Sequence, residues 1–232
     1  GIDFVVNPRV LVTDEMIHIA RSHGALDVHF FGDRQIELAE MRVNSNSIAV
    51  GKTLSEIKFP IDTLVGAVIR DGRLFVPRGD SSLELDDRVY LFGRTDRINA
   101  AEDLLSRGHE AASVAIYGDK DISKILARGL TSQGIRTLLI VDDREQAQSL
   151  AEDLPKTTVL NASGSDLAML SEEQIGRYDI YFAVTQDDEN NLMSGLLAKR
   201  LGVDRVVCLV QKRSFADIYR ELGIDVVLSP TQ

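Results

Sequence analysis

The most constraining feature of the sequence is a regular alternation of short apolar runs and helical patterns over residues 114–228. Strands that alternate with helices in this way form a parallel sheet with right-handed crossovers. We therefore expect an α/β domain with a Rossmann-like, doubly wound parallel sheet over residues 113–232. The expected strands are 114–117, 137–141, 158–160, 180–184, 206–210 and 226–228, and the expected helices are 121–132, 144–153, 166–175, 188–201 and 215–222.

A dense polar cluster follows the fourth of these strands. Thr185, Asp187 and Asn191 stand between the apolar run 180–184 and the helical pattern that begins at residue 188. Ligands of open α/β sheets bind at the carboxyl ends of the strands, so this cluster is a candidate site. The alternative is structural, because acidic residues at a helix amino end also cap the helix and interact favourably with its dipole.

The first strand ends at Gly118, where a dinucleotide-binding loop would read Gly-x-Gly-x-x-Gly. This chain reads Gly118-Asp119-Lys120-Asp121-Ile122-Ser123, so the second and third glycines are missing. Asp119 and Asp121 place negative charge where an anionic pyrophosphate would lie. We predict a degenerate nucleotide-binding fold in which NAD(H) binds weakly or not at all.

Two further acids complete the candidate nucleotide site. Asp142 ends the second strand, 142 − 118 = 24 residues past Gly118, where a ribose-binding acid is expected. Asp166 follows the third strand and either lines the same crevice or caps the next helix. The predicted nucleotide-binding residues are Gly118, Asp142, Asp166, Thr185, Asp187 and Asn191.

Residues 32–107 predict a smaller α+β domain. We expect a strand near residues 36–43 and a short helix over 51–57, with Thr53 and Glu56 forming a capping box. Asp71-Gly72 predicts a tight hairpin between two strands, since this pair readily adopts positive φ angles. Further expectations are a strand at 89–92 and a closing helix over 94–106.

Residues 9–31 are expected to be mainly helical and amphipathic. Residues 1–8 resemble residues 223–230, each an apolar run that starts with glycine and ends in proline. Because a fixed offset indicates duplication, we interpret 1–8 as the last strand of a preceding Rossmann-like domain, paired with another segment or subunit. The absence of an initial methionine supports the expectation that the chain is a fragment.

Composition excludes several classes of function. The net charge of −10 argues against a nucleic-acid partner, and no apolar run approaches the roughly 18 residues of a membrane helix, so we expect no direct membrane insertion. A single cysteine, Cys208, fits a reducing cytoplasm. All four histidines precede the Rossmann-like domain and lack metal-site spacing. We therefore predict neither catalytic residues nor metal ligands.

Two parts of the chain resemble a known family. Thr-x-Asp-Asp-Glu-x-Asn-x-Met-Ser at 185–194, with Leu-Ala-Lys-Arg-Leu-Gly at 197–202, resembles the TrkA family, also called the RCK or KTN family. The segments 50–54, 69–72 and 76–80 resemble its carboxyl-terminal TrkA-C domain. Residues 161–166 replace a Gly-Asp-Ala-Thr-Asp-like loop and keep only Asp166 and the small residues.

The resemblance implies a non-catalytic cytosolic regulatory subunit that senses nucleotide and gates a bacterial potassium uptake transporter. Residues 1–31 would be the tail of a first Rossmann-like domain and a crossover helix, residues 32–107 a TrkA-C domain and residues 113–232 a TrkA-N domain. The implied cofactor of the full-length protein is NAD(H) or ADP/ATP, with weak or no binding by this chain alone.

The implied partners are an integral membrane potassium transporter subunit and further copies of the protein, in a dimer or tetramer ring. The implied location is the inner face of the cell membrane, reached through the transporter. Two alternatives remain, a regulator of a cation/proton antiporter and an NAD-dependent oxidoreductase.

Overall fold

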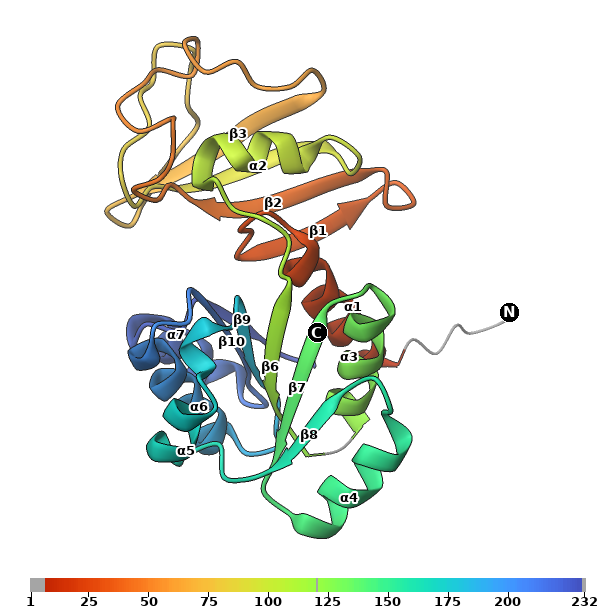
Figure 1. Cartoon of the computed structure of the whole chain (residues 1–232). Coiled ribbons are helices and arrows are strands. Elements are labelled where there is room, and N and C mark those ends of the chain that lie inside the picture. The colour runs from red at the N-terminus through yellow and green to blue at the C-terminus, as the bar shows by residue number, and fades with distance from the viewer. Residues whose placement is uncertain (1–6, 120, 231–232) are drawn as a thin grey trace. The chain divides into compact units, whose positions relative to one another are not determined.

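The computed structural model describes residues 7–119 and 121–230, which fall into two compact units (Figure 1). The larger unit contains the residues up to Ala20 and those from Ala111 onward, and the smaller unit is Arg21–Glu110. The strand predicted for residues 1–8 lies almost wholly outside the described residues. Its last residue, Pro8, begins a helix, and Asn7 Oδ1 caps that helix by accepting a 3.0 Å hydrogen bond from the Arg9 amide.

The larger unit is built on a six-stranded parallel sheet in the order β11-β10-β9-β6-β7-β8 (Figure 1). The prediction of a doubly wound Rossmann-like domain is confirmed. The strands are β6 (Ser113–Tyr117), β7 (Arg136–Val141), β8 (Thr158–Asn161), β9 (Ile180–Ala183), β10 (Arg205–Leu209) and β11 (Val226–Leu228). The helices are α3 (Asp121–Ser132), α4 (Arg144–Asp153), α5 (Leu167–Glu172), η1 (Ile175–Arg177), α6 (Asp188–Leu201), η2 (Arg213–Phe215) and α7 (Ala216–Glu221).

The two central strands of this sheet, β6 and β9, are buried along their whole length. Continuous apolar strands of this kind need helices on both faces of the sheet. The chain runs outward from β6 through β7 and β8, then returns to place β9 on the other side of β6. This reversal makes the carboxyl ends of β6 and β9 the topological switch point, where such sheets bind ligands.

Helix α1 (Pro8–Arg21) packs on this larger unit of its own chain. Ile17 lies so close to Gly129 of α3 that a Cβ atom on Gly129 would stand 2.2 Å from Ile17 Cδ1. Arg205 Nη1 donates a 2.9 Å hydrogen bond to the Ile19 carbonyl, and Met16 is fully buried. The amphipathic helix expected here therefore packs on the core of its own chain. The helical expectation for residues 22–31 is wrong, because α1 ends at Arg21 and Asp27–Phe31 is a strand.

The smaller unit is a five-stranded antiparallel sheet in the order β1-β2-β5-β3-β4, with one helix on it (Figure 1). The hairpin predicted at Asp71-Gly72 is confirmed, with φ angles of 49° and 75°. The elements are β1 (Asp27–Phe31), β2 (Ile36–Arg42), β3 (Thr63–Arg70), β4 (Arg73–Phe75), β5 (Arg88–Arg94) and α2 (Ile98–Ser106).

The short helix predicted over residues 51–57 is wrong. One of the two capping-box bonds forms, since Glu56 Oε2 accepts from the Thr53 amide at 2.8 Å. In place of the other, the Thr53 hydroxyl donates to Glu56 Oε2 at 2.8 Å, and the Glu56 amide donates to the Thr53 carbonyl at 3.0 Å. The backbone nevertheless stays in turns, because Val50 and Thr53 make isolated bridges to Leu83 and Ser82. Pairing with another segment replaces the internal hydrogen bonds that a helix would need.

One carboxyl pair is buried between the sheet and α2. Glu37 on β2 is 6% exposed, and Glu102 on α2 is 0% exposed. Glu102 Oε2 accepts a 2.7 Å hydrogen bond from the His23 amide. The pKa of Glu37 is raised to about 8, first because burial removes its carboxyl group from water and second because of the Glu102 charge.

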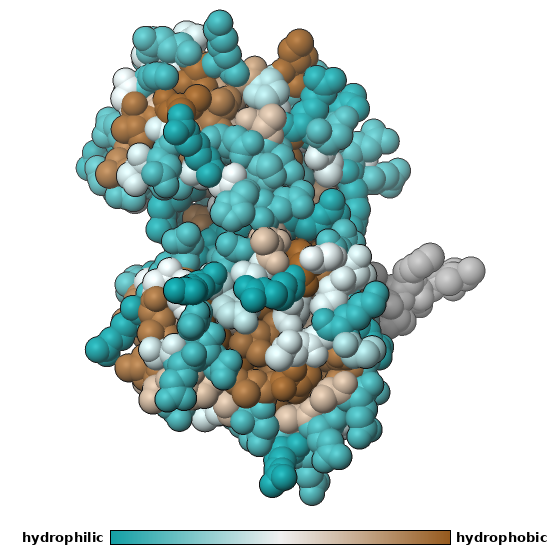
Figure 2. All heavy atoms as spheres, in the orientation of Figure 1, coloured by the Kyte–Doolittle hydropathy of each residue, from teal (hydrophilic) through white to brown (hydrophobic). Residues whose placement is uncertain are grey.

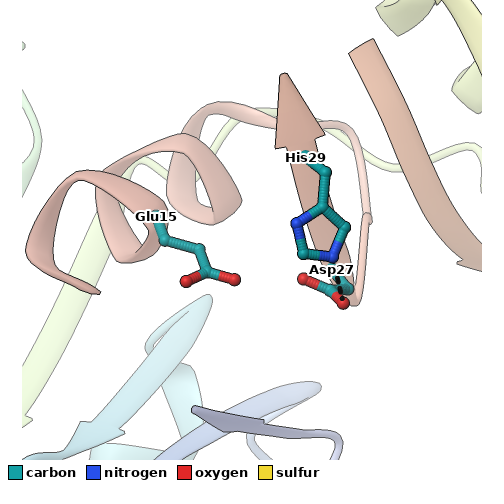
Figure 3. A group of neighbouring side chains, drawn as sticks. All are labelled: Glu15, Asp27 and His29. Carbon is teal, nitrogen blue, oxygen red and sulfur yellow. Dashed lines mark hydrogen bonds and ion pairs between the residues drawn. The ribbon is translucent and has the colours of Figure 1, made fainter. Parts of the chain in front are cut away.

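The sheet face away from α2 is open and partly apolar. The register places Leu38, Phe92 and Leu64 in one row across β2, β5 and β3, and Leu64 is 64% exposed. Figure 2 views this unit from the opposite side, the one that carries α2, and shows apolar atoms open to solvent there too. On β1 the face away from α2 carries Asp27 and His29, whose carboxylate and imidazole are 3.1 Å apart (Figure 3; Glu15, also drawn, belongs to α1 of the larger unit).

Candidate functional site

The carboxyl edge of the parallel sheet collects the predicted site residues, because Gly118, Asp142, Asp166 and Thr185 follow four different strands. A cleft of about 230 Å³ opens at this edge. Its lining residues are Arg9, Asp119, Asp121, Ile122, Val184, Gln186, Gln211 and Pro230. None of the six predicted site residues is among these lining residues. Five of them stand in the loops that follow strands of this sheet, and Asn191 lies within α6.

Gly118 has a packing role at the end of β6. A Cβ atom at this position would lie 2.5 Å from the Ser123 Cβ atom and 3.0 Å from Val184 Cγ2. Only glycine therefore allows α3 and the end of β9 to approach β6 this closely. The close helix–strand approach of a Rossmann fold is kept even though the rest of the glycine pattern is absent.

The loop after β6 is acidic where a pyrophosphate would bind. Asp121 stands in the first turn of α3, and Arg9 Nη1 of α1 lies 2.5 Å from its Oδ2 atom. Both side chains are about half exposed, so this ion pair adds little stability. Sequence reasoning missed Arg9, because the two partners are 112 residues apart and no local pattern links them. Lys120, which follows Asp119 in this loop, lies outside the described residues.

Asp142 is engaged by a side chain of its own sheet. The Tyr117 hydroxyl donates a 2.5 Å hydrogen bond to Asp142 Oδ2, and Tyr117 is only 3% exposed. Burial is the first cause that raises the pKa of this phenol, and the bond to Asp142 is the second. Tyr117 therefore remains a neutral donor at physiological pH. In the sequence, Tyr117 is the last residue of the expected strand 114–117, and no local pattern links it to the site.

The side chain of Asn191 stabilises the loop between β9 and α6 through hydrogen bonds. Its Oδ1 atom accepts hydrogen bonds from the Thr185 amide at 2.9 Å and the Thr185 hydroxyl at 2.7 Å. Its Nδ2 atom donates to the carbonyls of Thr185 at 2.9 Å and Leu209 at 3.0 Å. Since an amide side chain offers two donors and two acceptor positions, these four bonds use all of its capacity. The structure therefore brings the predicted site residues Thr185 and Asn191 together, but both are buried in the protein interior instead of facing the cleft.

The acids near this loop cap helices or hold neighbouring backbone. Asp187 accepts from the Asn190 amide at 2.8 Å as the amino-terminal cap of α6. Asp188 accepts from the amides of Gln211 and Lys212 at 2.7 and 3.1 Å, which joins α6 to the loop after β10.

Asp166 makes the same kind of contact at a different helix. It caps α5 through the amides of Ala168 and Met169, at 3.0 and 3.2 Å. Asp166 and Asp187 therefore make the capping contacts weighed as the alternative to ligand binding.

The residues present do not fit a dinucleotide at this edge. A pyrophosphate needs close backbone contact and a helix amino end without competing anions. Here the lining includes the carboxylates of Asp119 and Asp121, and the acid expected for the ribose is already bonded by Tyr117. The edge keeps the shape of a nucleotide site while its charge and its hydrogen bonds disfavour that ligand.

Comparison with known proteins identifies both units. The TrkA-N domain family matches residues 114–230, and the TrkA-C domain family matches residues 38–106. The Trk system potassium uptake protein TrkA of Vibrio alginolyticus is 33% identical over 235 residues, which cover 100% of this chain and 51% of that protein. A TrkA homolog of Archaeoglobus fulgidus is 30% identical over 99% of this chain and 52% of its own length. The chain thus spans about half the length of these curated relatives.

Solved structures show the same fold. The GsuK RCK domain superposes with a TM-score of 0.63 at 20% sequence identity, covering 96% of this chain and 48% of that one. The GsuK channel bound to NAD gives a TM-score of 0.62 at 20% identity, covering 97% and 40% of the two chains. Within the described residues of this chain, no helix combines the length and apolar character needed to cross a membrane.

Proposed function

Because the chain belongs to the TrkA family, with a TrkA-C domain followed by a TrkA-N domain, we propose that it serves in a non-catalytic regulatory subunit of a bacterial potassium uptake system. Its partner would be an integral membrane potassium transporter subunit. Further copies of the protein would complete a dimer or a tetramer ring at the inner face of the cell membrane. Relatives named as Trk potassium uptake proteins over the whole chain support this assignment.

The regulatory signal in this proposal is a nucleotide, NAD(H) or ADP/ATP, bound by the full-length protein. Nucleotide can shift a gating equilibrium only if it binds one arrangement of the assembly more tightly than another. The Rossmann-like sheet and an NAD-bound relative of the same fold support the choice of ligand class. We assign the TrkA-N domain of this chain a minor part in that binding.

The minor part of this TrkA-N domain in nucleotide binding is inferred from two carboxylates, Asp119 and Asp121, which line the cleft at the carboxyl edge. Two negative charges near a diphosphate each cost on the order of 1 kcal/mol at partly exposed separations. Asp121 also occupies the helix amino end that a phosphate would use. A site of this kind suits a regulatory domain with a structural role better than one that must hold a dinucleotide for hydride transfer.

Potassium-limited growth tests the proposed function. A strain that lacks its own regulatory subunit, but keeps the membrane transporter, should recover growth when the full-length protein is expressed. Recovery should not require Asp119 or Asp121, so the Asp119→Asn/Asp121→Asn variant serves as the matched comparison. Failure of the full-length protein to restore uptake, while it co-purifies with no transporter subunit, would disprove the assignment.

A second measurement tests the minor role of this domain. Calorimetry on the chain should detect no micromolar binding of NADH, and Asp119→Asn/Asp121→Asn should tighten ADP binding by several-fold as two repulsive charges are removed. Micromolar NADH binding by the wild-type chain that disappears in Asp142→Ala would contradict this role.

A further inference from the structure

Tyr117 makes the same hydrogen bond to Asp142 that a bound nucleotide would make. In dinucleotide-binding sheets, an acid at the end of the second strand accepts a hydrogen bond from a ribose hydroxyl. Asp142 ends β7, the second strand of this sheet, and its Oδ2 atom accepts from the Tyr117 hydroxyl at 2.5 Å. The phenol of the protein thus stands in for the ribose hydroxyl.

The ring of Tyr117 is covered by the loop that follows β8. A Cβ atom on Gly164 would lie between 2.5 and 2.6 Å from three atoms of that ring. The loop therefore rests directly on the ring. The backbone of Asp142 is fixed by Asn161 at the end of β8, whose Nδ2 atom donates to the Asp142 carbonyl at 2.8 Å.

Burial makes this arrangement persistent. Tyr117 is 3% exposed, and its ring belongs to the apolar cluster that includes Ala115, Leu138 and Ile140. Moving the ring aside would expose apolar surface and leave a polar hydroxyl to find a new partner. The part of the edge around Asp142, where the adenosine of a dinucleotide would bind, is therefore closed by the core of the domain itself. This closure is independent of the acidic loop after β6.

We propose that Tyr117 is an internal ligand of this TrkA-N domain, which occupies Asp142 and excludes adenosine nucleotides from this half of the protein. This inference rests on the proposed function, because it explains how one TrkA-N domain of a nucleotide sensor is kept out of nucleotide binding. It makes Tyr117 the residue that determines ligand specificity at this edge.

Calorimetry with ADP and adenosine on the whole chain tests the proposal. Tyr117→Val removes both ring and hydroxyl and should bind ADP at least tenfold more tightly than the wild-type chain. Adding Asp142→Asn should abolish most of that gain, since the ribose loses its charged acceptor. Tyr219→Phe is the control, because the Tyr219 hydroxyl also donates a hydrogen bond at the carboxyl edge, but to the backbone carbonyl of Asp188 instead of the Asp142 carboxylate.

A second variant covers the case in which Tyr117→Val fails to fold. Tyr117→Leu keeps an apolar side chain in the core but removes both the hydroxyl and the ring. Millimolar adenosine should then shift the backbone NMR signals of Asp142 and Ser163 in Tyr117→Leu, but not in the wild-type chain. Unshifted signals in folded Tyr117→Leu would overturn the proposal.

Two calorimetric results would also overturn it. One is wild-type ADP affinity within threefold of that of folded Tyr117→Val, and the other is a gain that survives Asp142→Asn. These outcomes are separate from the potassium-limited growth test. A chain that excludes adenosine through Tyr117 but restores no potassium uptake would disprove the proposed function alone.

Discussion

Glu37 on β2 and Glu102 on α2 place two carboxyl groups in the interior of the smaller unit, and the Glu102 carboxylate holds the amide of His23. The pKa of Glu37 rises from its usual 4.5 to about 8 in the folded chain. The unfolded chain therefore releases this proton at lower pH than the folded chain. Stability contributed by Glu37 is fully present below pH 4.5 and is lost as the pH rises toward 8.

Glu37→Gln should remove this pH dependence. We expect the free energy of unfolding of the smaller unit to increase by on the order of 2 kcal/mol near pH 7.5 and to change little near pH 4.5. Urea unfolding followed through NMR signals of β2 and β5 at a series of pH values measures it. Glu40→Gln is the control, because Glu40 lies on the same strand but pairs with Arg88. Identical pH slopes for wild type and Glu37→Gln would contradict the prediction.

Asn191→Ala should destabilise the larger unit by on the order of 3 kcal/mol. The change leaves buried backbone groups of Thr185 and Leu209 without hydrogen-bond partners, and each such group costs about 1–3 kcal/mol. Chemical denaturation measures the loss. The neighbouring exposed residue provides the control, since Asn190→Ala should stay within about 0.5 kcal/mol of wild type. Equal stability of the two variants would show that the hydrogen bonds of the Asn191 side chain do not contribute to stability.

Gly118→Ala should cost about 1–3 kcal/mol, because the new Cβ atom would overlap the Ser123 Cβ atom. Ser123→Gly removes that neighbouring atom. A double-mutant cycle from unfolding curves should therefore give a coupling energy of at least about 0.5 kcal/mol, with the double variant more stable than additivity predicts. Strict additivity would mean that the overlap with Ser123 does not explain the glycine.

Cys208 should be unreactive in the folded chain. It is fully buried, its pKa is raised mainly by burial, and its Sγ atom contacts the Asn191 carbonyl at 3.4 Å. Because it is the only cysteine, thiol labelling under native conditions should proceed at the rate of opening or unfolding. Urea should raise the labelling rate in parallel with the loss of circular dichroism. Rapid stoichiometric labelling without denaturant would contradict the burial.

The fold of the larger unit could be predicted because its signals are local. The helices at 121–132, 144–153 and 188–201 begin and end at the expected residues, where apolar spacing and caps coincide. Long-range pairing was not predictable in the same way. Residues 27–31 form a strand because they pair with β2, and residues 51–57 stay in turns because they bridge to Ser82 and Leu83.

The location of the candidate site could be predicted from the sequence, but the contacts of its residues could not. The ends of the predicted strands locate the carboxyl edge of the sheet and therefore the loops at Gly118, Asp142 and Thr185. The partners of these residues were not found, because Arg9 meets Asp121 across 112 positions and Tyr117 meets Asp142 across neighbouring strands. Whether an acid contacts a ligand or its own protein depends on such pairings, which leave no local pattern in the sequence.

The amide of Asn191 has no hydrogen-bonding capacity left over for a ligand. A search that identifies domains by the stretch Thr-x-Asp-Asp-Glu-x-Asn therefore detects a requirement of folding rather than of chemistry. A domain that matches this stretch can therefore be mistaken for a nucleotide-binding domain when its asparagine only stabilises the loop between β9 and α6. On our proposal, nucleotide binding by such a domain depends instead on the ends of β6 and β7, where the Tyr117 hydroxyl donates a hydrogen bond to Asp142.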